Sequence, residues 1–105
     1  MVDPELDELR REFLAETVAK VREIEEKAGG DRSAQSIERL TYLAHQLKGS
    51  GGSYGFERIS AEAAEIEKIA ERIAAGDDVA SLGEKLRQHA ESLRAEVEQR
   101  SKELG

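Results

Sequence analysis

Hydrophobic residues recur every three or four positions along four successive segments of this 105-residue chain, and glycines interrupt the pattern between segments. This period places the apolar side chains of each segment on one face of an α-helix. Aspartate and then proline at the start of the first segment are typical of a helix N-terminus. The predicted helices begin at Asp3-Pro4, near Ser33, ahead of Ile59 and at about Val79, and the glycine breaks fall at Gly29-Gly30-Asp31, at Gly49 to Gly55 and at Gly76-Asp77-Asp78.

Each predicted helix carries one apolar stripe, and the connections between helices are short. Short connections favour antiparallel neighbours. We therefore expect an all-α fold, an antiparallel up-down-up-down four-helix bundle that forms a single domain over residues 1–105. The stripes are Leu6, Leu9, Phe13, Thr17, Val21 and Ile24, widened by Leu14 and Val18; then Ile37, Leu40, Ala44 and Leu47; then Ile59, Ala63, Ile66, Ala70 and Ile73; and last Leu82, Leu86, Ala90, Leu93 and Val97.

The composition excludes several classes of function. A net charge of −7 opposes binding to a nucleic-acid backbone. The absence of cysteine excludes disulfides, thiolate catalysis and cysteine-ligated zinc. No apolar run reaches the roughly 18 residues that span a bilayer, and no signal peptide is recognisable. We therefore expect a cytoplasmic, monomeric protein without a membrane or nucleic-acid partner.

The chain has two histidines, and helical geometry separates them. At about 100° per residue, His45 lies roughly 130° from the centre of its helix's apolar stripe, so its ring is expected in solvent. His89 lies only about 60° from the centre of the stripe on the last helix. We interpret His89 as a boundary residue that covers the edge of the core.

The neighbours of His45 favour a reactive role. Imidazole is mostly neutral at pH 7, and its unprotonated nitrogen is a nucleophile. Lys48 lies one turn away and can offset negative charge acquired by the histidine, while Gly49 leaves the approach free of a side chain. The glycines beyond Lys48 do not form a nucleotide-binding loop, because in such a loop the lysine follows the final glycine. The pattern points to a histidine that carries a phosphoryl group.

These residues also carry a family resemblance. The segment Ala44-His-Gln-Leu-Lys-Gly-Ser50, followed by Gly55-Phe56, resembles the signature of histidine-containing phosphotransfer domains. The glycine-rich variant from Lys48 to Phe56 is most similar to the phosphotransfer domain of chemotaxis-type histidine kinases. The resemblance covers essentially the whole chain, since that family is also a helical bundle with its histidine on the second helix.

The resemblance implies a role for individual residues. His45 would be phosphorylated at Nε2, Lys48 would neutralise charge and Gly49 would open the approach. In the chemotaxis-type relatives a glutamate on the third helix orients the histidine, and by spacing it falls on Glu67. Those relatives often have a second histidine near the position of Ala64, which this chain lacks.

The function that follows is phosphoryl transfer without catalysis by the chain itself. His45 would take the phosphoryl group from a phospho-aspartate receiver or a kinase and pass it to a receiver-domain aspartate. The chain would hold no ATP site and no cofactor, and the Mg²⁺ would be bound by the partner receiver. We expect the receiver or kinase to dock near His45, over Leu14, Val18, Thr41, Tyr42, Gly49 and Gly52.

Two other classes of function stay open. The chain could be a scaffold or oligomerisation bundle in which His45 is incidental, since the last helix is long and highly charged. A metal site of carboxylates and histidine is the weaker alternative. Glu38 and His45 are two turns apart, and no Glu-x-x-His pair occurs.

Overall fold

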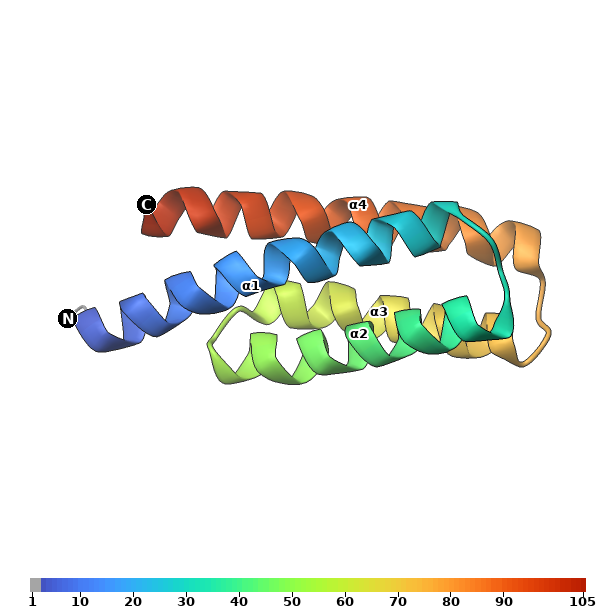
Figure 1. Ribbon diagram of the computed structural model, residues 1–105, viewed down its shortest axis with the longest axis horizontal. Helices are drawn as coiled ribbons and strands as arrows, with labels where there is room; N and C mark the ends of the chain where they lie inside the picture. The colour runs from blue at the N-terminus through green and yellow to red at the C-terminus, as the bar shows by residue number, and fades with distance from the viewer. Residues whose placement is uncertain (1–2) are drawn as a thin grey trace.

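The computed structural model describes residues 3–105, except for the side chain of Val79, and it consists of four helices joined by short loops. Residues 1–2, which the single-domain prediction includes, lie outside the described part. Figure 1 shows the helices side by side, with the start of α1 and the end of α4 at the same end of the bundle. The predicted antiparallel four-helix bundle is confirmed. The helices are α1 (Pro4–Gly29), α2 (Ala34–Ser53), α3 (Glu57–Ala74) and α4 (Val79–Leu104).

Polar side chains cap three of the four helix N-termini. The Asp3 carboxylate accepts hydrogen bonds from the backbone N–H of Glu5 at 3.0 Å and of Leu6 at 3.4 Å, and Pro4 follows it. Ser33 caps α2 and Asp78 caps α4 in the same way, at 3.1 and 3.3 Å. Such caps satisfy backbone donors that a helix leaves free and are each worth about 1 kcal/mol.

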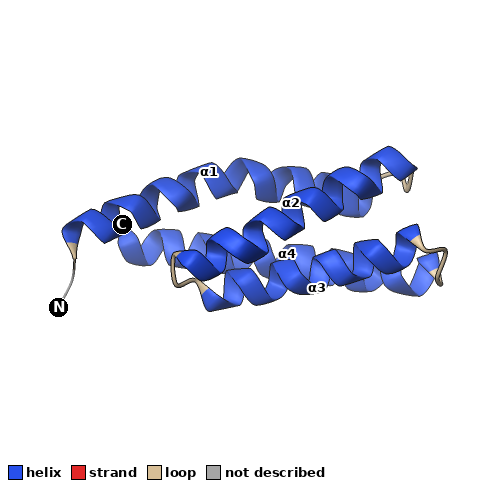
Figure 2. Ribbon diagram, turned by 90° about the horizontal axis from the view of Figure 1, so that it is seen from below, coloured by secondary structure: helices blue, strands red, loops and turns tan. Residues whose placement is uncertain are grey.

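The helices pack in a ring in which each contacts its two neighbours. α2 packs against α3, α3 against α4, α4 against α1 and α1 against α2. Across the diagonals, the Cα atoms of α1 and α3, and those of α2 and α4, stay more than 8 Å apart within residues 3–105. Figure 2 shows the same four elements from a perpendicular direction, with α2 and α3 running close together. One continuous core fills the ring; its fully covered side chains include Ile24, Leu40, Leu43, Leu47, Ile59, Ile66, Leu86 and Leu93.

The start of α1 differs from the prediction. Leu6 and Leu9 belong to the predicted apolar stripe, yet they are 37 % and 48 % exposed. Figure 1 shows the reason: the first turns of α1 extend beyond the connection between α2 and α3, so neither α2 nor α3 covers them. Burial on α1 begins with Phe13. No helix in the described residues has the length and apolar character that a membrane crossing requires.

The connection between α2 and α3 explains how α2 ends. α2 continues through Gly49, Gly51 and Gly52 to Ser53, so these glycines do not terminate it as the sequence pattern suggested. The backbone N–H of Gly55 donates to the carbonyl of Gly52, and that of Phe56 donates to Gly51. This is a Schellman motif, and its left-handed position falls on Gly55, with φ of 82°.

Aromatic residues hold this connection against α1. The ring of Phe13 stacks on Tyr54 at 4.8 Å and on Phe56 at 5.8 Å between centroids. Arg10 donates from Nε to the carbonyl of Tyr54 at 2.8 Å and lies over the ring of Phe56. The turn that follows the glycine-rich end of α2 is therefore fixed by packing as well as by hydrogen bonds.

Candidate functional site

His45 projects into solvent from the middle of α2, on the side that faces α3. Its side chain is 66 % exposed. Nδ1 lies 2.6 Å from Oε2 of Glu67, which comes from α3 and whose side chain is only 13 % exposed. The ring is thus open to a partner while one of its nitrogens is held by the protein.

The contact with Glu67 determines which nitrogen of the ring carries the proton. An ionised carboxylate can only accept hydrogen bonds, so Nδ1 must carry the proton that joins the two side chains. In a neutral imidazole the lone pair then lies on Nε2, the nitrogen at the far edge of the ring. The contact therefore favours the tautomer whose unprotonated nitrogen is Nε2.

Lys48 completes a chain of three polar side chains. Its Nζ donates to Oε1 of Glu67 at 2.7 Å, while Oε2 of the same carboxylate faces His45. The hydrogen bond from Lys48 is the main cause that holds the pKa of Glu67 below its ordinary value, and the hydrogen bond from His45 acts in the same direction. Partial burial opposes both effects, yet the net direction is downward. Glu67 is accordingly a carboxylate at neutral pH. Sequence reasoning did not foresee the pairing of Lys48 with Glu67.

Two nearby glycines have different surroundings. A Cβ on Gly49 would meet nothing within 4 Å, so this part of α2 offers an open surface next to Lys48. A Cβ on Gly51 would lie 3.1 Å from the backbone nitrogen of Ser60 and 3.2 Å from a side-chain carbon of Ile59. Gly51 therefore permits the close approach of α3, which the Ser60 hydroxyl reinforces by donating to the carbonyl of Lys48 at 2.7 Å. This close packing sets the register that brings Glu67 to His45.

An open hollow of about 840 Å³ runs along the bundle surface between α2 and α3, and we call it the α2–α3 groove. His45 and Glu67 line it together with residues nearer the start of α2 and the end of α3. The Tyr42 side chain is 51 % exposed. The other residues that line the groove are Arg32, Ala34, Ile37, Glu38, Thr41, Tyr42, Glu71, Ile73 and Ala74.

The structure divides the predicted docking residues. Thr41 and Tyr42 line the α2–α3 groove beside His45, and Gly49 and Gly52 are exposed on α2. The prediction that Leu14 contacts a partner was wrong: its side chain is 2 % exposed and belongs to the core, because it lies on the inward face of α1. The same prediction was wrong for Val18. Its side chain is exposed, but it lines a small pocket between α1 and α4 and not the face that bears His45.

The second histidine has a partner of the same kind but a different setting. Nδ1 of His89 on α4 lies 2.7 Å from Oε2 of Glu62 on α3. The side chains are 33 % and 19 % exposed, so this pair lies at the edge of the core, as expected for a boundary histidine. No group of three or more metal-ligating side chains lies together in the part of the chain that the structure describes.

The bundle presents an exposed imidazole with one nitrogen held by a carboxylate and the other free, beside a lysine and an open helix surface. Fold and site together are those of a small helical module with one exposed histidine on its second helix. The model of the Hpt domain family matches residues 8–99, and the chain belongs to this family. The family's function is histidine phosphotransfer in phosphorelays, and Hpt domains are phosphocarrier modules without kinase activity of their own. Comparisons with curated proteins and with solved structures gave no significant match.

Proposed function

We propose that His45 carries the phosphoryl group on Nε2, receiving it from a phospho-aspartate of a receiver domain or from a kinase and passing it to the aspartate of a receiver domain. The observation that supports this most directly is the geometry of the ring. Nδ1 is 2.6 Å from Glu67 while the side chain is 66 % exposed. A histidine so placed can be reached by a second protein and has a defined reactive nitrogen.

The transfer is a displacement at phosphorus. The Nε2 lone pair attacks the phosphorus of the aspartyl phosphate, an N–P bond forms, and the P–O bond to the acyl oxygen breaks. The electron pair of that bond leaves with the aspartate carboxylate. The imidazole ring becomes positively charged, and its Nδ1–H continues to donate to Glu67, whose carboxylate stabilises that charge. Attack by a receiver carboxylate on the phosphohistidine reverses these steps.

Lys48 and Gly49 act through charge and access. Lys48 holds Glu67 in place and adds positive charge near the phosphoryl group, an effect worth about 0.3–1 kcal/mol at an exposed site. Gly49 leaves open the surface over which a partner approaches. The Mg²⁺ that transfer to or from aspartate requires is supplied by the receiver, and we expect the reaction in the cytoplasm.

Labelling with phosphoramidate, a small P–N phosphodonor, tests the proposal without any partner protein. The wild-type chain should gain an acid-labile, alkali-stable phosphate. His45→Gln should abolish it, while His89→Gln should leave it intact. If neither substitution changes any phosphate signal, the proposal fails, and a scaffold role with size-exclusion behaviour as its readout becomes the better account.

A further inference from the structure

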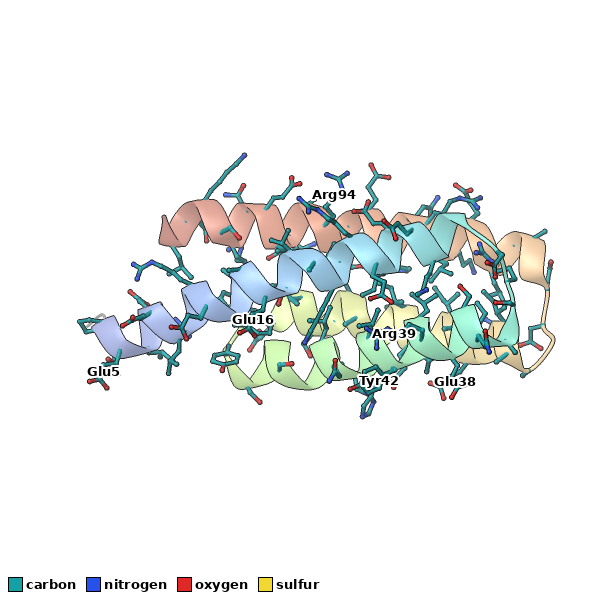
Figure 3. All side chains as sticks on the ribbon, in the orientation of Figure 1. Glu5, Glu16, Glu38, Arg39, Tyr42 and Arg94 are labelled. Carbon is teal, nitrogen blue, oxygen red and sulfur yellow. The ribbon has the colours of Figure 1, made fainter. Side chains whose placement is uncertain are left out.

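Three side-chain hydrogen bonds join α2 to α3 in the part of the chain that the structure describes, and two of them end on Glu67. In the third, the hydroxyl of Ser60 on α3 donates to the carbonyl of Lys48 on α2 at 2.7 Å. On its other side α2 is joined to α1 by Arg39, which pairs with Glu23 at 2.8 Å and which Figure 3 shows on the side of α2 that faces α1. Such a largely exposed ion pair holds a helix only weakly. Apart from Glu67 itself, the polar side chain that ties α2 to α3 is therefore Ser60.

The Ser60 hydroxyl differs from the other serine and threonine hydroxyls that donate to a backbone carbonyl. A hydroxyl that donates four positions back within its own helix connects nothing beyond that helix. Ser60 has the same option at the carbonyl of Phe56, to which its backbone N–H donates at 3.1 Å, yet its hydroxyl donates to α2. Within residues 3–105 it is the one hydroxyl whose hydrogen bond joins two helices. The hydroxyls that donate within their own helix are those of Thr17, Thr41, Ser50 and Ser53.

Ser60 and Glu67 contact α2 in the same register. A Cβ on Gly52 would lie 3.6 Å from the Ser60 hydroxyl oxygen, just as His45 faces Glu67. From His45 to Gly52 on α2, and from Ser60 to Glu67 on α3, the separation is seven residues in each case. Seven residues are two helical turns, or about 10 Å. Because the two helices are antiparallel, fixing α3 at Ser60 also brings Glu67 to the level of His45.

The packing around Ser60 leaves little room for another register. A Cβ on Gly51 would already lie 3.1 Å from the backbone nitrogen of Ser60 and 3.2 Å from a side-chain carbon of Ile59. Displacing α2 by one turn, about 5.4 Å, would bring the Leu47 side chain to this place and would break the Ser60 hydrogen bond. The Ser60 side chain is half-buried, which shields that bond from water.

We propose that Ser60 is a positioning residue for phosphoryl transfer: its hydroxyl fixes α3 on α2 so that Glu67 stays on Nδ1 of His45 and Nε2 is left free. The inference rests on the proposed role of His45. The hydrogen bond of Ser60 goes to the backbone of α2 and not to the ring or the carboxylate, so Ser60 acts through Glu67. One neutral hydrogen bond corresponds to about fivefold in the population of the aligned arrangement.

Ser60→Ala tests this role because it removes the hydroxyl and keeps the rest of the side chain. The rate of phosphoramidate labelling should fall by about three- to fivefold. Ser60→Thr, which restores a hydroxyl, should recover most of the rate. Ser50→Ala is the matched control, since it removes a half-buried hydroxyl that bonds only within α2, and it should label at the wild-type rate. A Ser60→Ala protein that labels as fast as the wild type would overturn the proposal.

A double variant separates positioning from a general loss of structure. In a Glu67→Gln background, Ser60→Ala should slow labelling no further, because the residue through which Ser60 acts has already lost its charge. A further slowing as large as the one in the wild-type background would show that Ser60 acts on the fold as a whole, and the positioning role would be refuted.

¹⁵N NMR of the unphosphorylated protein gives a readout that requires no transfer. At alkaline pH, where imidazole is neutral, the two ring nitrogens of His45 should have well-separated shifts, as one tautomer requires. In Ser60→Ala these shifts should move toward each other, and unchanged shifts would contradict the positioning role. By contrast, a wild-type protein that shows the tautomer but takes no label would contradict the proposed function of His45, and the role of Ser60 in transfer would fall with it.

Discussion

Nδ1 of His45 and Oε2 of Glu67 lie 2.6 Å apart, although the residues are 22 positions apart and belong to different helices. The imidazole ring is therefore oriented by the packing of α3 against α2 and not by α2 alone. That packing depends on the close approach at Gly51, where a side chain would meet the backbone of Ser60. Chemistry at the surface and packing in the interior are linked at this site.

Replacing Glu67 tests the orienting contact. Glu67→Gln keeps the shape but removes the charge that favours the Nδ1–H tautomer, so phosphorylation of His45 should slow by about tenfold. The rate of phosphoramidate labelling measures the effect. Glu62→Gln is the matched control, because it removes the same kind of contact from His89. Both variants should lose about 1 kcal/mol of stability, but only Glu67→Gln should slow labelling. Equal labelling rates would refute the orienting role.

The lowered pKa of Glu67 predicts a pH-dependent contribution to stability. Its pKa in the folded state lies below the ordinary glutamate value of 4.5, so the folded state binds fewer protons than the unfolded state in the acid range. The stabilisation is fully present above that value and is lost as the pH falls through the folded pKa. Urea unfolding of wild type and Glu67→Gln between about pH 3 and pH 7 should show a difference that shrinks toward acid. A difference that grows toward acid would contradict the sign.

Lys48→Ala removes the main cause that lowers the pKa of Glu67. The pKa of the carboxyl should therefore rise, which a ¹³C NMR titration of the side-chain carboxyl measures directly. Transfer should become slower or the phosphohistidine shorter-lived, without complete loss, because the nucleophile itself is unchanged. An unshifted Glu67 titration would show that the Lys48–Glu67 contact does not persist in solution.

Gly49→Ala and Gly51→Ala form a pair with opposite expectations for folding. Alanine at position 49 meets open space and improves helix propensity, so stability should rise by up to about 1 kcal/mol while receiver transfer slows. Alanine at position 51 must push against the backbone of Ser60 and the buried Ile59, so stability should fall by about 1–3 kcal/mol. Thermal unfolding ranks the two, and a Gly51→Ala protein that melts above Gly49→Ala would contradict this packing.

The helices and most of the core follow from local pattern. Stripes such as Ile59, Ala63 and Ile66 are buried where the period places them, because a bundle buries one face of each helix. The exceptions come from the lengths and angles of helices relative to one another. Leu6 and Leu9 are exposed because the start of α1 extends past its neighbours, a property that one helix's period does not encode. Leu14 is buried, as its place in the apolar stripe predicts, and only its assignment to the docking surface was wrong.

At the candidate site, too, some features follow from the pattern of a single helix and others depend on how two helices pack. The exposure of His45 follows from angles on a single helix, and the placement of Glu67 follows the family resemblance. The pairing of Lys48 with Glu67 and the shape of the α2–α3 groove depend on how two helices meet, which no pattern within one helix reports. The available signal was the position of Glu38 and Thr41 on the same face as His45.

The central claim is that His45 accepts phosphate at Nε2, with Nδ1 held by Glu67. Heteronuclear ³¹P and ¹⁵N NMR of the phosphorylated, ¹⁵N-labelled protein assigns the bonded nitrogen directly. The account predicts one phosphohistidine, coupled to phosphorus through Nε2 of His45 and absent from His45→Gln. A signal coupled through Nδ1, or a phosphate that survives in His45→Gln, would contradict it.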